Sequence, residues 1–277
     1  MFSSRGRLGS CVSRLTLLLL PSHVSRLSSH GPQVSPIALH TAFEVGAYFV
    51  GMRLFLWQRR LLALPVLEDR DRSLWIGVAA IFGAALGAKL GYWIEDPQNA
   101  FANFPDWRHL LEGKTIVGAL LGGLIGVELV KRAIGAQGSS GDAFALALIV
   151  GIAIGRIGCF AAGLDDHTYG NPTDLPWAVD FGEGIPRHPT QLYEIAFLIA
   201  LALMIQGRRN VFVEPGDRFR TFLIAYLAFR LLIDFIKPMP QVYLGAFSGI
   251  QLLCLAGLLY YHRDIPRIAR VVAWGRS

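Results

Sequence analysis

The sequence is poor in charge and in cysteine. Only 17% of its 277 residues are Asp, Glu, Lys or Arg, whereas 53% are hydrophobic, and the mean hydropathy is +0.44. Soluble domains carry about 25% charged residues, so this composition excludes an ordinary soluble domain and fits a polytopic membrane protein. The alternating segments of about ten residues that an outer-membrane barrel needs are also missing. Cys11, Cys159 and Cys254 lie far apart without metal-ligand spacing, and the sequence gives no sign of a metal or an organic cofactor.

The sequence contains several long apolar runs with few charged residues. A helix of about 20 apolar residues crosses the hydrocarbon core of a bilayer. We therefore expect an all-α fold, a bundle of seven transmembrane helices in a polytopic integral membrane protein. The expected spans are residues 36–57, 74–94, 115–134, 143–163, 190–206, 220–237 and 243–261.

The domain organisation follows from these spans. Residues 1–35 contain arginine and serine but no acid, and they resemble a weak signal or transit segment, or an overlong start. Residues 36–262 form the expected membrane domain, and residues 263–277 a basic tail. Between spans two and three, residues 97–113 are too polar to span and suit a short helix at the membrane surface, anchored by its aromatic residues.

Basic residues gather in alternate loops, which predicts an orientation. Because basic loops stay cytoplasmic, the N-terminus is expected outside, the C-terminus in the cytoplasm, and the loop after span four outward-facing. The arginines of residues 1–35 argue against this orientation, and the four loops are given more weight. The basic side chains are spread over loops, so no nucleic-acid partner is expected. They are Arg59, Arg60, Arg70, Arg72, Lys131, Arg132, Arg208, Arg209, Arg218, Arg220, Arg263, Arg267, Arg270 and Arg276.

The stretch from Ile154 to Glu194 is the centre of the functional argument. An arginine at membrane depth is costly and marks a functional site by default. Arg156 is flanked by Gly155 and Gly158, so a phosphate could be held bidentately while a headgroup approaches the backbone. Alternatively, Arg156 forms an intramembrane ion pair with Asp234 or Glu194, and both interpretations can hold together. The loop over residues 165–173 could supply a general base, or its polar residues could simply form solvent-exposed turns.

Span six carries a second polar group. Tyr226, Arg230, Asp234 and Lys237 follow one another at spacings of four, four and three, so we expect all four on one helical stripe facing the bundle interior. Arg230 and Asp234 form a structural pair, or Arg230 converges with Arg156 on an anionic headgroup.

Two further patterns concern helix packing. In span one, His40 and Glu44 are four residues apart, so they could line a polar cavity or form an interhelical hydrogen-bonded pair. In span two, Gly83, Gly87 and Gly91 form a stripe of small residues that predicts close packing against a neighbouring helix.

Several motifs together resemble a known family. They are GRIGCFAAG from Gly155, YGNPT from Tyr169, PW from Pro176, RHPTQLYE from Arg187 and FRLLIDFIKP from Phe229. Over roughly residues 36–260 the chain resembles the bacterial prolipoprotein diacylglyceryl transferases. That family is a seven-helix inner-membrane enzyme whose active site opens to the outer leaflet.

The resemblance implies a reaction. The family moves the diacylglyceryl group of phosphatidylglycerol onto the thiol of a lipoprotein's lipobox cysteine, forming a thioether and releasing glycerol phosphate. This chemistry needs a phosphate clamp and a way to deprotonate a thiol. By motif, the implied catalytic residues are Arg156, Arg230 and His188, and Asp166, in what looks like a short insertion, is a further catalytic candidate. The implied substrate-binding residues are Gly155, Gly158, Gly163, Arg187, Gln191, Tyr193, Glu194, Tyr226 and Asp234.

The sequence departs from the family pattern at four places. Cys159 stands for the family's asparagine, Leu164 for its glutamate, and Ala42 or Phe43 for a tyrosine of span one. The His-Gly-Gly motif aligns with Gly118-Ala119-Leu120, so its histidine is absent. The implied replacement for this base is Asp166, His167 or His188.

We therefore expect a transferase of lipoprotein biosynthesis in the plasma (inner) membrane. Its expected partners are phosphatidylglycerol, the lipobox segment of prolipoproteins and membrane lipids. One alternative is a related protein that binds an anionic headgroup but uses another acceptor or has lost catalysis. Another is a purely structural membrane protein, in which Arg156 and Arg230 serve only as interior ion pairs.

Overall fold

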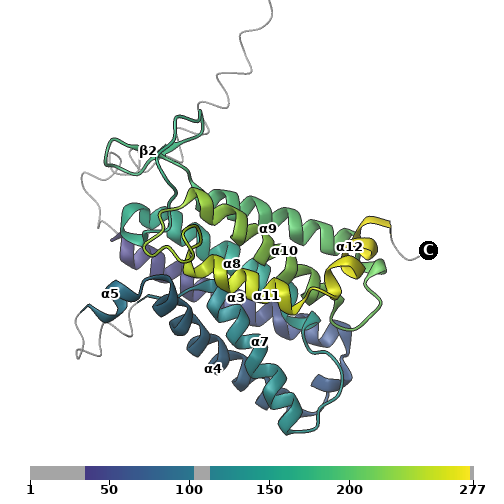
Figure 1. The fold of residues 1–277 in the computed structure, drawn as a ribbon. Helices are drawn as coiled ribbons and strands as arrows, with labels where there is room; N and C mark the ends of the chain where they lie inside the picture. The colour runs from purple at the N-terminus through teal and green to yellow at the C-terminus, as the bar shows by residue number, and fades with distance from the viewer. Residues whose placement is uncertain (1–34, 103–112, 275–277) are drawn as a thin grey trace, which may run out of the picture. The chain divides into compact units, whose positions relative to one another are not determined.

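A computed structural model describes residues 35–102 and 113–274, which are mostly helical (Figure 1). The expected tail over residues 1–35 lies outside the described residues except for Ser35, and so do Phe104, Trp107 and Leu110 of the expected surface helix. The described chain forms two compact units. The first takes the described part of Met1–Tyr48 with Ile152–Phe197, and the second Phe49–Gly151 with Leu198–Ser277.

The first unit contains three helical pieces and a loop. The helices are the start of α3 (Pro36–Leu62), the end of α8 (Asp142–Ala162) and the start of α9 (Thr190–Gly207). The loop begins with the short helix η2 (Gly163–Asp166). It then forms a two-stranded antiparallel sheet of β1 (Val179–Asp180) and β2 (Pro186–Arg187), with Val179 opposite Arg187.

The loop of the first unit is held by its own hydrogen bonds. The Asp180 carboxylate accepts from the backbone N–H groups of Gly182, Glu183 and Gly184 at 2.8–3.1 Å, which closes the turn between the strands. Gly182 has φ +114° there, a conformation that glycine adopts without a steric penalty. The backbone N–H of Gly170 donates to the carbonyl of His188 at 2.9 Å. The loop is therefore an ordered structure rather than a solvated linker.

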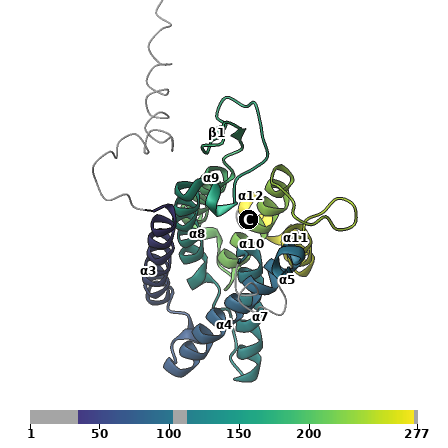
Figure 2. The ribbon, with the colours of Figure 1, turned by 90° about the vertical axis from the view of Figure 1, so that its left-hand side faces the viewer.

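The second unit contains the rest of α3, α8 and α9 together with the other helices of the described chain. In this unit α4 and α7 run side by side, and α12 packs on α10 (Figures 1 and 2). The remaining elements are η1 (Pro65–Leu67), α4 (Arg70–Glu95), α5 (Pro97–Phe101), α7 (Ile116–Ala133), η3 (Arg209–Val211), α10 (Asp217–Ile233), η4 (Asp234–Ile236), α11 (Gly249–Tyr260) and α12 (Asp264–Trp274).

Helices α4 and α7 meet through glycine. A Cβ atom built on Gly87 would overlap the carbonyl oxygen of Gly118, and one on Gly122 would lie 2.7 Å from the Cα of Gly87. One turn away, a Cβ on Gly83 would meet the carbonyl oxygen of Gly122 in the same way. The two backbones are in direct contact, as the small-residue stripe predicted.

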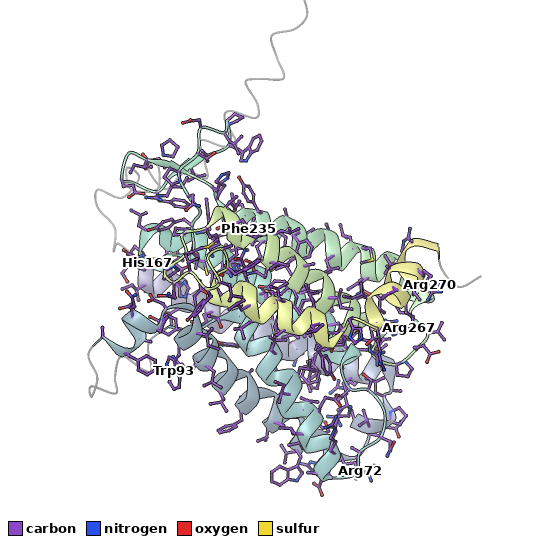
Figure 3. All side chains as sticks on the ribbon, in the orientation of Figure 1. Arg72, Trp93, His167, Phe235, Arg267 and Arg270 are labelled. Carbon is purple, nitrogen blue, oxygen red and sulfur yellow. The ribbon has the colours of Figure 1, made fainter. Side chains whose placement is uncertain are left out.

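Side chains from distant parts of the second unit fix the ends of its helices. The Asp142 carboxylate accepts from the backbone N–H groups of Gly216 at 2.7 Å and Phe219 at 3.1 Å, so it caps α10. Arg267 of α12, labelled in Figure 3, binds the buried Asp217 through both terminal nitrogens, at 2.7 and 3.1 Å. This hydrogen bond raises the pKa of Arg267, and the pair fastens α12 to the start of α10.

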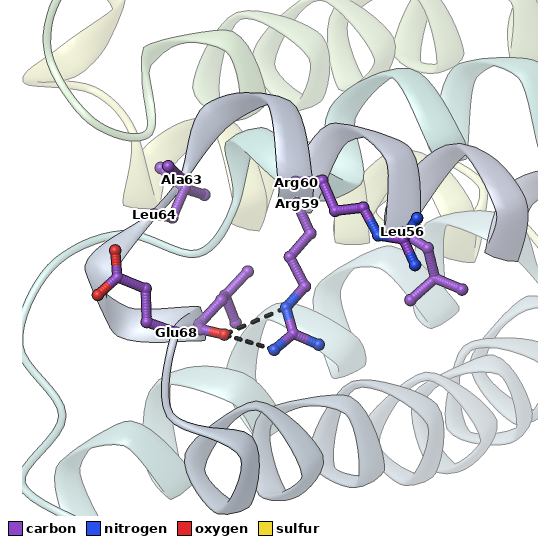
Figure 4. Close-up of a pocket in the computed structure, with 7 residues that line it drawn as sticks. Leu56, Arg59, Arg60, Ala63, Leu64 and Glu68 are labelled. Carbon is purple, nitrogen blue, oxygen red and sulfur yellow. Dashed lines mark hydrogen bonds between the residues drawn. The ribbon is translucent and has the colours of Figure 1, made fainter.

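The turn after α3 is closed by a basic side chain. Arg59 donates from Nε and Nη2 to the carbonyl oxygen of Leu67, at 3.1 and 2.7 Å (Figure 4). Leu56, Arg60 and Glu68 line the same shallow pocket. The Arg59 bonds satisfy a carbonyl at the end of η1, so this pocket is explained by turn geometry.

The predicted spans can be compared with the helices. Each of the seven predicted ranges overlaps an α-helix, namely α3, α4, α7, α8, α9, α10 or α11, but the range 220–237 runs past the end of α10 and the range 243–261 begins before α11. Among the described residues, three helices are long and apolar enough to cross a membrane: α4, α8 with η2 (Asp142–Asp166), and α9. Helix α11 is apolar but shorter.

Candidate active site

Arg156 lies in the last two turns of α8. Arg156 is 7% exposed and Glu194 is 2% exposed. The Nε atom of Arg156 lies 3.0 Å from Oε2 of Glu194. Glu194 belongs to the first turns of α9, so the ion pair joins the two helices on either side of the loop. Of the two partners that the sequence proposed for Arg156, the structure pairs it with Glu194.

The glycines beside Arg156 play different parts. A Cβ on Gly158 would lie 2.7 Å from the Cβ of Phe43, so this glycine lets α8 approach α3. A Cβ on Gly155 would meet nothing within 4 Å. Gly163 begins η2 with φ +64°, which turns the chain from α8 into the loop. The backbone at Gly155 is therefore not in close contact with another helix on that side.

The start of the loop is tied to α9. Thr168 donates its hydroxyl hydrogen to Asp166 at 2.5 Å and accepts from Nε2 of Gln191 at 3.2 Å. The hydroxyl of Thr190 donates to the carbonyl of Thr168 at 2.6 Å. Asp166 is half-buried, whereas His167 is exposed and has φ +52°. Asp166 is therefore the positioned acid of the loop.

The second half of the loop brings aromatic side chains to His188. The Nδ1 of His188 lies 3.3 Å from the Tyr193 hydroxyl, which accepts from Nε1 of Trp177 at 2.7 Å. Arg187 binds Glu183 and lies over the ring of Tyr169, with 4.8 Å from its guanidinium carbon to the ring centroid. The hydrogen bond with Glu183 raises the pKa of Arg187. His188 is thus oriented by Tyr193.

Near the end of α8 lies a cluster of three side chains that the sequence analysis did not predict. His40, Cys159 and Asp166 place one ligand atom each within 4.8 Å of the others. Their separation in the chain hides this arrangement from any spacing rule. It is the group of the described residues that could hold a metal ion.

The second unit holds the polar group of α10. Nη2 of Arg230 lies 3.3 Å from Oδ1 of Asp234, and both residues are buried. The Ser248 hydroxyl donates to the other oxygen of Asp234. Ser248 also caps α11, in a box closed by Gln251. Asp234 is thus held by an arginine and a hydroxyl at once.

The expected stripe of span six is confirmed in part. Tyr226 and Arg230 are buried on α10. The helix ends at Ile233, Asp234 starts η4, and Lys237 follows in an extended conformation. The expectation that Lys237 projects from the same helix is wrong, because the helix ends before Pro238, which disfavours helical conformation in the residue that precedes it.

These features describe a multi-pass membrane protein with buried arginine–carboxylate pairs. A sequence profile described as "LGT: Prolipoprotein diacylglyceryl transferase" matches residues 36–261. The chain belongs to the prolipoprotein diacylglyceryl transferase family.

Curated relatives carry the corresponding name. The chain is 34% identical over 219 residues to a phosphatidylglycerol–prolipoprotein diacylglyceryl transferase of Geobacter sulfurreducens, covering 74% of this chain and 77% of the relative. It is 33% identical over 240 residues to the protein of that name from Bordetella bronchiseptica, covering 79% and 87%. A third, from Methylococcus capsulatus, is 36% identical over 202 residues, covering 65% and 72%.

Proposed function

We propose that the chain transfers the diacylglyceryl group of phosphatidylglycerol to the lipobox cysteine thiol of prolipoproteins. Its membership in the family supports this function, as do relatives that carry the name of the reaction. The observation that carries the proposal is the buried Arg156, which is oriented by Glu194. A desolvated guanidinium in such a place suits an anionic phosphate headgroup.

Arg156 of the first unit and Arg230 of the second are each proposed as phosphate-binding arginines. Arg156 and Arg230 are both buried and both paired with a carboxylate, which fixes the orientation of each guanidinium. Fixed positive charge stabilises the negative charge that develops on the leaving glycerol phosphate. The proposed substrate-binding residues are Gly155, Gly158, Gly163, Arg187, Gln191, Tyr193, Glu194, Tyr226 and Asp234.

We propose further that this member lacks the histidine of the His-Gly-Gly motif. Gly118 takes that position, and a Cβ there would overlap the carbonyl oxygen of Gly87, which leaves no room for an imidazole on this backbone. Asp166 and His188 are the proposed replacements within the loop. The exposure of His167 speaks against it as a base, because a general base must reach the buried reacting group.

The proposed setting is the plasma (inner) membrane. Seven helices would span it, with the N-terminus outside, the C-terminus cytoplasmic and the loop over residues 163–189 facing outward. Residues 36–262 would form the transferase domain, with a preceding tail at 1–35 and a basic cytoplasmic tail at 263–277.

Mass spectrometry tests the proposed reaction. Purified protein in detergent receives labelled phosphatidylglycerol and a lipobox peptide, and a diacylglyceryl adduct on the peptide cysteine is expected. The adduct should vanish in Arg156→Ala and persist in Arg209→Ala, a variant of an exposed arginine outside the site. Bound phosphatidylglycerol without adduct would instead support the alternative suggested by Gly118, a headgroup-binding protein with another acceptor or none.

A further inference from the structure

His40, Cys159 and Asp166 form one cluster of potential metal ligands in the first unit. The ligand atoms lie within 4.8 Å of one another, and Nδ1 of His40 is 3.3 Å from Oδ1 of Asp166. All three side chains are half-buried. The cluster combines nitrogen, sulfur and oxygen donors, which is the donor set of zinc sites.

The Nδ1 atom of His40 faces the cluster. Nδ1 is buried and makes no hydrogen bond within the described chain, because its contact with Asp166 lacks hydrogen-bond geometry. A buried polar atom without a hydrogen bond carries a desolvation cost. A cation between Nδ1, the thiolate and the carboxylate would remove this cost.

Two of the three ligands have a polar neighbour outside the cluster. Nε2 of His40 faces the Glu44 carboxylate at 3.8 Å, and Asp166 accepts from the Thr168 hydroxyl on its other oxygen. Metal-binding histidines ordinarily direct the second ring nitrogen at a carboxylate, and metal-binding carboxylates are themselves hydrogen-bonded. Thr168 is in turn fixed by Gln191, so the support extends to α9.

We propose that His40, Cys159 and Asp166 bind a divalent cation of the zinc class. The thiolate selects a borderline-soft metal over magnesium or calcium. With the thiolate and the carboxylate the site carries two negative charges, which balance the cation. Three protein ligands leave a fourth tetrahedral position open, as in catalytic rather than structural zinc sites.

The open position suits the acceptor thiol, a role that rests on the proposed function. Binding to the cation removes the thiol proton to solvent, as it does for coordinated thiols in general. The sulfur then bonds to the glyceryl carbon, the bond from that carbon to the phosphate oxygen breaks, and the electron pair leaves with glycerol phosphate. Nη1 of Arg156 lies 3.8 Å from the sulfur of Cys159, so a phosphate held by Arg156 would lie beside the acceptor. The site thereby supplies the deprotonation otherwise assigned to the family histidine.

Metal content and a cobalt spectrum test the site. The full chain is purified in detergent, stripped with a chelator, and reloaded with Zn²⁺ or Co²⁺. About one zinc per chain is expected by elemental mass spectrometry, and the Co²⁺ form should show thiolate-to-cobalt charge-transfer absorption. Cys159→Asn should lose the absorption and hold zinc at least tenfold more weakly. This variant carries the asparagine usual in the family, and its gel-filtration profile reports folding.

The matched control is Cys254→Ala, which alters the other cysteine of the described chain. It should keep both zinc and absorption. Zinc content at background in the reloaded protein, or the same content and absorption in Cys159→Asn, would overturn the site.

The catalytic role has a separate readout. Metal retention is measured without substrate, so it does not depend on the proposed function. Transfer that runs equally fast in stripped and reloaded protein would overturn the role of the cation in thiol activation. Bound zinc with no transfer from either form would instead overturn the proposed transferase function.

Discussion

The guanidinium Nε of Arg156 lies 3.0 Å from Oε2 of Glu194, so the two helices on either side of the loop are joined by a buried ion pair. Burial of both charges means that removing one partner leaves the other without compensation. Such losses cost about 3–5 kcal/mol, more than an exposed ion pair contributes. This pair therefore has a structural role whatever ligand Arg156 binds.

A double substitution separates the two roles. Arg156→Ala should abolish transfer and lower the free energy of unfolding by about 3–5 kcal/mol. Arg156→Met with Glu194→Gln removes both charges, so most of the stability should return while transfer stays absent. The checks are thermal unfolding in detergent and the adduct assay. Transfer regained in the double variant would contradict a phosphate role for Arg156.

A second prediction concerns Ser248, whose hydroxyl donates to Asp234 and also caps the start of α11. Ser248→Ala removes the cap and the hydroxyl, and should lower the free energy of unfolding by about 0.5–2 kcal/mol. Ser248→Thr keeps the hydroxyl and should cost less. Denaturation midpoints of the two variants give the comparison, and equal losses would show that the hydroxyl contributes nothing.

The third prediction compares two glycines of the same helix. Gly87→Ala puts a methyl group against the carbonyl of Gly118 and should destabilise the protein by about 1–3 kcal/mol. Gly77→Ala meets nothing within 4 Å, so removing a helical glycine there should stabilise by about 0.5–1 kcal/mol. Melting temperatures in detergent report both signs. The same sign in both variants would exclude backbone contact as the cause.

Membrane orientation is tested by labelling cysteines on intact cells. Asp180 in the loop and Arg132 after α7 are both exposed. A membrane-impermeant maleimide should react with Asp180→Cys from outside, and with Arg132→Cys only after the cells are lysed. The unaltered chain gives the background of the native cysteines. Labelling of Arg132→Cys on intact cells would reverse the proposed orientation.

The helices were predictable because their apolar runs are long. The runs at residues 74–94 and 143–163 become α4 and α8, with boundaries that shift by a few residues at polar ends. The close contact of α4 and α7 was also predictable, since the glycine spacing of four places Gly83 and Gly87 on one face. The number of spans and the outward position of the loop stay predictions.

Contacts of the candidate site were predictable only where the two residues lie one helical turn apart in the sequence. Arg230 and Asp234 lie four residues apart, and the structure pairs them. Spacing carries no information on contacts between helices, so the sequence left two partners open for Arg156. For the same reason the approach of His40 to Cys159 and Asp166 was not visible. Lys237 shows the opposite error, in which a regular spacing continued past the last residue of the helix.

The glycine contact between α4 and α7 also bears on how a lipid reaches a buried site. Where a single methyl group does not fit between Gly87 and Gly118, a chain of methylene groups cannot pass either. Along these turns the pair is a closed wall to acyl chains. A two-tailed donor lipid that enters sideways from the bilayer therefore does not pass between α4 and α7 at these turns.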